Sequence, residues 1–137
     1  MEYNLDVFEY FVNKYSLNPL QKSPIEILKI NRVLMAQNMA ELGFKTGAEV
    51  GVAAADHSET LLQNIPDLKL YCIDPWANVD GFTQFRSSTL QNWGIMAKEK
   101  LSKYENCTII QDVSMNAVRN FPDHFFDFVY MIICFLA

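Results

Sequence analysis

The first third of the chain alternates apolar and polar residues at helical spacing. Between residues 5 and 15 an apolar side chain recurs every three or four positions, which predicts an amphipathic helix ending before Asn18-Pro19. Ser23-Pro24-Ile25-Glu26 predicts the start of a second helix, because it offers a serine cap, a proline at the first helical position and a glutamate at the third. Gly43 suits a left-handed end for that helix. Both helices precede the first strand and are expected to cover the sheet or to form a lid.

From residue 46 onward the pattern changes to short apolar runs that alternate with helical segments. Strands are predicted at 48–52, 68–73, 107–110 and 126–136, and helices at 56–65, 82–104 and 114–120. In the first of these helices Asp56 and Glu59 have the spacing of a capping box. Strands that alternate with helices predict a mainly parallel sheet with right-handed crossovers.

This pattern predicts an α/β, Rossmann-like partial parallel sheet of strand order 3-2-1-4, with helices on both faces. Residues 1–45 are expected to form an N-terminal helical extension, and residues 46–137 the Rossmann-like domain. The final run, 128–137, is strongly apolar, and a parallel strand of that kind is normally covered on both faces. It is therefore expected either to pair with another chain, which means self-association, or to mark a chain truncated after the fourth strand. We favour truncation.

Composition and charge narrow the range of partners. A length of 137 residues suits one domain with a single core. The net charge of −5, without a cluster of lysine or arginine, argues against nucleic acid as the main partner. Three scattered cysteines have no zinc-ligand spacing, so no metal site is predicted. The sequence shows no signal peptide and no apolar run of about 20 residues, which favours a cytoplasmic protein without membrane contact.

The most informative segment is the turn after the first predicted strand. Gly51 stands where the backbone can approach a ligand closely, and Val52 and Ala53 add only small or apolar side chains. Glu49 and Asp56 flank this turn, whereas a pyrophosphate-binding turn should lack carboxylates. The acidic flanks favour a cationic ligand, and S-adenosylmethionine carries both a sulfonium and an ammonium group.

The helix that follows this turn supplies a second feature. Its first amides, ending at Ser58, lie at a helix N-terminus, which attracts a carboxylate such as that of a methionine group. The alternative is a plain strand-to-helix turn that Asp56 caps. The histidines, His57 and His124, have no evident partner in the sequence, and neither is predicted to act as a base.

The second predicted strand ends at a carboxylate. Asp74 follows Gly51 by 23 residues, and an ionised carboxylate there can accept hydrogen bonds from both ribose hydroxyls. Pro75 fixes the exit of the chain, and Trp76 offers a flat face for the adenosine. The alternatives are a loop carboxylate and a core aromatic. Together with the turn, Asp74 predicts a nucleoside-binding βαβ unit.

Polar residues also follow the third predicted strand. Asp112 is placed to accept a hydrogen bond from the exocyclic amine of an adenine, and Val113 to pack on the ring. Ser114 either contributes to the same contact or caps the short helix that follows. No catalytic residue is identified.

These residues together resemble the class I S-adenosylmethionine-dependent methyltransferases, in particular the small-molecule O-methyltransferase-like group with a Glu-x-Gly-Val motif. The likeness runs from about residue 34 to 130. It is carried by Glu49-Val50-Gly51-Val52 with Ser58, by Ile73-Asp74-Pro75-Trp76, by residues 112–114 and by residues 126–130.

The resemblance implies an enzyme that transfers a methyl group from S-adenosylmethionine to a small molecule, at a hydroxyl. It implies that Glu49 and Gly51 contact the methionine end, Asp74 the ribose, and residues 112–114 the adenine region. Two departures stand out. Ala55 replaces a second glycine, so the turn there must avoid positive φ or accept strain, and the acidic residue that usually follows the fourth strand is absent after Tyr130.

Two other classes of protein stay open. A nicotinamide-dependent oxidoreductase shares the ribose carboxylate, but Ala53 and Ala55 interrupt the Gly-x-Gly-x-x-Gly turn that it requires. An inactive remnant or a non-catalytic interaction module is the stronger alternative, because an apolar terminal strand is a ready pairing edge.

Overall fold

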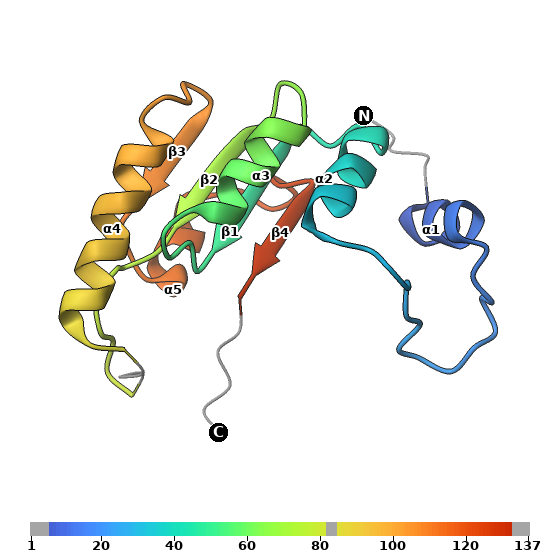
Figure 1. Cartoon of the computed structure of the whole chain (residues 1–137), viewed down its shortest axis with the longest axis horizontal. Coiled ribbons are helices and arrows are strands. Elements are labelled where there is room, and N and C mark those ends of the chain that lie inside the picture. Colours follow the sequence, from blue (N-terminus) through green and yellow to red (C-terminus); the bar gives the residue numbers. More distant parts are fainter. Residues whose placement is uncertain (1–5, 82–84, 133–137) are drawn as a thin grey trace.

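Four parallel strands form one sheet in the order β3-β2-β1-β4 (Figure 1). The computed structural model describes residues 6–81 and 85–132. The strands are β1 (Thr46–Val50), β2 (Lys69–Ile73), β3 (Cys107–Ile110) and β4 (Phe128–Met131). This confirms the α/β class and the strand order predicted from the sequence.

The helices are α1 (Val7–Tyr15), α2 (Arg32–Glu41), α3 (Asp56–Asn64), α4 (Ser87–Leu101) and α5 (Ser114–Ala117), followed by the 3₁₀ turn η1 (Val118–Asn120). The helices after α1 cover both faces of the sheet, whereas α1 lies to the side and contributes to neither core (Figure 1). One core joins Ala36 of α2, Leu61 of α3 and Leu101 of α4 to β2, whereas Ala117 of α5 belongs to a core on the opposite face. Within the described ranges no helix has the length and apolar character needed to cross a membrane.

The central strand β1 places apolar side chains on one face of the sheet and a carboxylate on the other. Ala48 and Val50 pack in the core that includes α5, so the side chain of Glu49 points to the opposite face, toward α3. A Cβ atom built on Gly47 would lie 2.2 Å from Cζ of the Phe128 ring. Only glycine leaves room for this ring, which joins the core beneath α2 and α3.

The predicted start of the second helix is wrong. Residues 23–31 are not helical, and α2 begins at Arg32 behind Asn31, whose side chain accepts a hydrogen bond from the amide of Leu34 at 2.9 Å. Asparagine is as good a cap as serine. The left-handed Lys29 (φ 64°) interrupts any helix that would start at Ser23.

The predicted end of the same helix is confirmed. Gly43 has a φ of 77° and donates to the carbonyl of Ala40, while Phe44 donates to the carbonyl of Met39. This pair of bonds is the Schellman arrangement, which satisfies carbonyls that the helix leaves free.

The capping box predicted for α3 does not form. The N-cap is Ala55, which has no side chain able to cap, and Asp56 is already the first helical residue. The Asp56 carboxylate pairs instead with Lys100, and that of Glu59 with Lys103 at 2.6 Å. These two ion pairs join the exposed edges of α3 and the end of α4.

Two predicted elements are shorter in the structure. The predicted helix 82–104 is α4, which begins at Ser87; residues 82–84 lie outside the described chain. The predicted strand 126–136 is β4, which ends at Met131; residues 133–137 also lie outside the described chain. The predictions about the terminal run therefore remain predictions.

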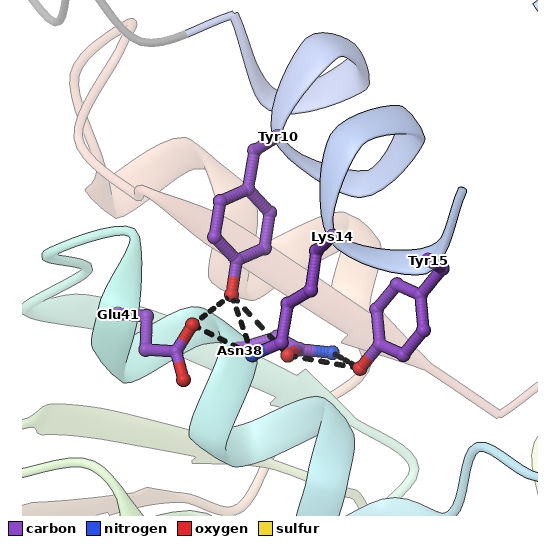
Figure 2. A network of polar contacts seen from close by, with 5 residues as sticks. All are labelled: Tyr10, Lys14, Tyr15, Asn38 and Glu41. Carbon is purple, nitrogen blue, oxygen red and sulfur yellow. Dashed lines mark hydrogen bonds and ion pairs between the residues drawn. The ribbon is translucent and has the colours of Figure 1, made fainter. Parts of the chain in front are cut away.

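A polar network attaches α1 to α2 (Figure 2). The hydroxyl of Tyr15 lies 2.7 Å from Nδ2 of Asn38, which is fully buried, and Lys14 forms an ion pair of 2.6 Å with Glu41. Tyr10 donates to both Asn38 and Glu41. No residue of α1 is itself buried, so polar contacts rather than a shared core hold this helix.

We predict that Gly47→Ala destabilises the fold by about 1–3 kcal/mol, because the added methyl group overlaps the ring of Phe128. Urea unfolding of the single variants, and of Gly47→Ala combined with Phe128→Leu, measures the effect. The combined loss should be smaller than the sum of the single losses, since the smaller side chain removes the overlap. Simple additivity would contradict this account of the contact.

Candidate functional site

The turn between β1 and α3 has an unusual backbone. Gly51 (φ 86°), Ala53 (φ 51°) and Ala55 (φ 67°) all adopt left-handed conformations within five residues. For alanine this conformation costs roughly 1–2 kcal/mol. The sequence left two outcomes for Ala55, either avoiding positive φ or accepting strain. Its φ of 67° shows that the chain accepts strain. Strained residues of this kind persist only where the surrounding contacts fix them.

The Asp74 carboxylate provides those contacts. Its Oδ2 accepts hydrogen bonds from the amides of Val52 (2.8 Å) and Ala53 (3.0 Å), and its Oδ1 accepts from the amide of Trp76 (2.8 Å). Hydrogen bonds to an ionised acceptor are stronger than those between neutral groups. Asp74 therefore joins the end of β2 to the turn after β1, and the two motifs found in the sequence form one site.

Trp76 holds the same turn from the other side. Its indole Nε1 donates to the carbonyl of Ala53 at 2.8 Å, and the side chain is only 3% exposed. The ring packs on Gly94 of α4, where a Cβ would lie 3.0 Å from Cγ of the indole. Of the two interpretations of Trp76, a face for the adenosine or a core aromatic, the structure supports the core aromatic. Pro75 precedes it and is half-buried.

Glu49 is a fully buried carboxylate with only one of its two oxygens in a hydrogen bond within the described residues. Oε2 accepts from the hydroxyl of Ser58, which is also buried, whereas Oε1 has no partner within the described residues. Burial raises the pKa of Glu49 to about 7, against the opposing effects of the Ser58 hydrogen bond and the charge of Arg32. The charge of Asp74 raises this pKa further, which places the two carboxylates in one neighbourhood.

His57 is a residue of this site that the sequence analysis missed. Its side chain is 4% exposed, and neither ring nitrogen has a partner within the described residues. Burial lowers the pKa of His57 to about 4, so the ring is neutral at pH 7. The ring packs on Tyr130 of β4 with centroids 4.0 Å apart. The sequence does contain a feature that indicates a buried His57. His57 lies four residues before Leu61, which puts both side chains on the buried face of α3.

The first turn of α3 offers unpaired donors beside these side chains. The first hydrogen bond inside the helix is that of Glu59 N to Ala55 O, at 3.1 Å. The amides of residues 56–58 therefore precede it, and they carry the positive end of the helix dipole.

At the end of β3, Asp112 orders the start of α5. Its Oδ1 accepts from the amide of Val113 at 2.7 Å and from Nδ2 of Asn116 at 3.2 Å. Val113 is the N-cap and Ser114 the first helical residue, so the capping alternative for Ser114 is wrong. No side chain caps α5, and the Asp112 carboxylate instead joins the residue before the helix to the side chain of Asn116.

Because the strands are parallel, the candidate site residues all lie at the carboxyl-terminal ends of the strands. Glu49 lies near the end of β1 and the turn follows it, Asp74 follows β2 and Asp112 follows β3, and the carboxyl ends of neighbouring parallel strands meet. The amide of Asp74 also donates to the carbonyl of Ile110 at 3.2 Å. Among residues 6–81 and 85–132, no group of three or more His, Cys, Asp or Glu side chains could hold a metal ion.

Comparison with known proteins supports this fold. No protein-family model matches the sequence, and neither does any curated protein. A similar solved structure is titled "Crystal structure of a putative caffeoyl-CoA O-methyltransferase from Staphylococcus aureus", with a TM-score of 0.54 and 17% identity. The match covers 92% of this chain and 53% of that one, so the chain spans about half of its length. At this identity the likeness shows a shared Rossmann-like fold.

We predict that His57→Phe leaves the free energy of unfolding unchanged or raises it by up to about 2 kcal/mol, because it removes two unsatisfied buried nitrogens and keeps a ring of similar shape. Urea unfolding at pH 7 measures this. Leu61→Ala, on the same face of α3, is the control and should cost about 2–5 kcal/mol. A loss above 1 kcal/mol in His57→Phe would mean that the imidazole has a structural partner.

We also predict that Glu49 and His57 drive opposite pH dependences of stability. Glu49 binds a proton more tightly when folded, so its contribution is present below pH 4.5 and disappears as the pH rises to about 7. His57 binds a proton less tightly when folded, so its contribution is present above pH 6.5 and disappears as the pH falls to about 4. The two slopes largely cancel between pH 4.5 and 6.5.

Unfolding of the variants across pH 4–7 separates these slopes. Relative to the unaltered protein, Glu49→Gln should gain stability as the pH rises, by up to about 3 kcal/mol, because only the His57 slope remains. His57→Phe should lose stability as the pH rises. Parallel pH curves for all three proteins would show that neither group titrates across this range.

Proposed function

We propose that this chain binds S-adenosylmethionine and acts as a methyltransferase on a small molecule, at a hydroxyl. The observation that carries the proposal is the pair of carboxylates at neighbouring strand ends. Glu49 keeps a free buried oxygen, and Asp74 is fixed on the turn that a nucleoside would cross. The fold shared with the solved structure titled as an O-methyltransferase supports this assignment at a coarse level.

The proposed roles follow from the contacts. The free oxygen of Glu49 accepts from the ligand ammonium, and Ser58 holds the other oxygen in place. Gly51, with Val52 and Ala53, lines the turn with backbone and small or apolar side chains. A buried carboxylate interacts strongly with a cation because the low dielectric weakens screening. In its ionised form, Glu49 is therefore the group that favours a ligand with an ammonium group.

Asp74 receives a more limited role than the sequence suggests. A carboxylate has about four acceptor positions, and three backbone amides occupy three of them. One position remains for a ribose hydroxyl. Pro75 then lies beside the ligand, Trp76 acts from behind by holding the carbonyl of Ala53, and residues 112–114 meet the adenine edge.

Methyl transfer from a sulfonium requires little from the protein beyond the positioning of the two reactants. Transfer of a methyl group from a sulfonium requires the donor carbon and the acceptor oxygen to be in line and near contact, and such positioning supplies a large part of a rate enhancement. We name no catalytic base.

We predict that the purified chain binds S-adenosylmethionine in calorimetry, and that Asp74→Ala weakens binding by about 1.5–3 kcal/mol through loss of hydrogen bonds to a charged group. Asp127→Ala is the matched control. Asp127 also accepts from two backbone amides, those of Lys45 and Thr46, but it does so at the amino-terminal end of the strands.

The control should lower stability and leave the affinity unchanged. Equal losses of affinity in both variants would show that general loosening of the sheet, and not Asp74, is responsible. Binding of NAD without S-adenosylmethionine would favour an oxidoreductase and overturn the proposal.

A second candidate is an inactive remnant or an interaction module. It is favoured by β4, an edge strand of the described sheet whose Val129 and Met131 side chains are exposed. Such an edge can pair with a second copy of the chain. Sedimentation that shows a dimer, together with no binding of any nucleoside, would support this candidate.

A further inference from the structure

Two cysteines that have no role in the proposed function lie in contact across neighbouring strands. Cys72 of β2 and Cys107 of β3 have their Sγ atoms 3.6 Å apart. Cys107 is opposite Leu70 in the parallel register, and Cys72 lies two residues further along β2, so the two cysteines are diagonal neighbours on one face of the sheet (Figure 1). Both belong to the core that includes α3 and α4. The sequence gave no sign of this pair, because 35 positions separate its members.

The two thiols differ in their access to solvent. Cys72 is 0% exposed, whereas Cys107 is the first residue of β3, an edge strand of the described sheet, and is only partly buried. The hydrogen bond between the thiols lowers the pKa of Cys107, and the same bond together with burial raises the pKa of Cys72. The thiolate is the form that reacts with oxidants. Cys107 is therefore the thiol that a small oxidant reaches first, and Cys72 lies directly behind it.

We propose that Cys72 and Cys107 form a redox modification site, which a hydroperoxide converts reversibly into a disulfide. The Cys107 thiolate attacks one peroxide oxygen, so that an S–O bond forms, the O–O bond breaks and hydroxide leaves. The proton that Cys107 gave up neutralises this hydroxide to water. The sulfur of Cys72 then attacks the sulfenic sulfur, the S–S bond forms, and the S–O oxygen leaves as water with the proton of Cys72. Two thiols are thus oxidised to one disulfide, and one hydrogen peroxide is reduced to two waters.

The diagonal placement favours a disulfide that is easily reduced. A disulfide holds its sulfurs about 2.05 Å apart, so the two Sγ atoms must approach each other by about 1.5 Å. Diagonal positions on neighbouring strands lie further apart than directly opposed ones, so closing the bond shifts the backbone and strains the bridge. Strained disulfides are the labile, regulatory ones. The site therefore suits a transient oxidation that small thiols reverse, rather than a permanent cross-link.

Mass spectrometry of the full chain tests the proposal. The reduced protein is treated with hydrogen peroxide, its remaining thiols are blocked with N-ethylmaleimide, and it is digested with trypsin without reduction. Trypsin separates the two cysteines into peptides 70–86 and 104–119. The expected product is these two peptides joined by a disulfide, and incubation with glutathione before digestion should release both thiols. Cys134→Ser, which lacks the third cysteine, should give the same cross-link.

Matched single variants test the order of the two steps. In Cys72→Ser the sulfenic acid of Cys107 has no thiol behind it, so it should accumulate and be trapped by dimedone. Cys72→Ala buries no hydroxyl group in the core and should behave in the same way. In Cys107→Ser the buried Cys72 should be oxidised about tenfold more slowly or less, because the thiol that peroxide reaches is gone.

Other products would overturn the proposal. Oxidation of Cys107 to a sulfinic acid while Cys72 stays reduced would show that Cys72 does not react with the sulfenic acid. A cross-link that joins Cys134 or two copies of the chain would show that the 3.6 Å contact is not used. Unchanged oxidation of Cys72 in Cys107→Ser would exclude the route through Cys107. None of these measurements involves S-adenosylmethionine, so this inference stands or falls independently of the proposed function.

Discussion

The structure depends on the hydrogen bonds that the Asp74 carboxylate accepts from the turn after β1. Three residues of that turn adopt left-handed conformations, and two of them are alanines, which do so at a cost. Two amides of the turn, those of Val52 and Ala53, donate to one oxygen of this carboxylate and offset the cost, while the amide of Trp76 donates to the other oxygen. Without them the first turn of α3 would lose its position over β1, and Glu49, Ser58 and His57 would no longer form one group.

In the candidate site, left-handed alanines lie next to buried side chains that lack hydrogen-bond partners within the described residues. Elsewhere, packing and hydrogen bonding agree: Gly47 makes room for Phe128, Asn31 caps α2, and Asp127 joins two strand starts. Around the turn, strain and unsatisfied buried groups lie together instead. Proteins concentrate such departures where they bind ligands. The location of the departures, more than any one residue, therefore marks the site.

The sequence predicts the sheet well because strand order follows from alternation and handedness, which are local signals with few solutions. It also pairs the turn with Asp74, since both lie at carboxyl ends of neighbouring strands. It fails where two local signals compete: Ser23-Pro24 and Asn31 both resemble helix starts, and only the fold selects the latter. The spacing of His57 to Leu61 indicates a buried position, but the lack of a partner for its ring nitrogens within the described residues follows only from how α3 packs on the sheet.

The attachment of α1 has a consequence for how the molecule opens. The helix contributes nothing to either apolar core, so its detachment breaks the polar contacts to Asn38 and Glu41 but removes no side chain from those cores. We therefore expect residues 6–31, which include α1, to unfold as a separate cooperative unit of low stability. A protease acting on the native ensemble would thus trim the N-terminal segment first and leave the strand framework, with its turn and carboxylates, as the resistant fragment.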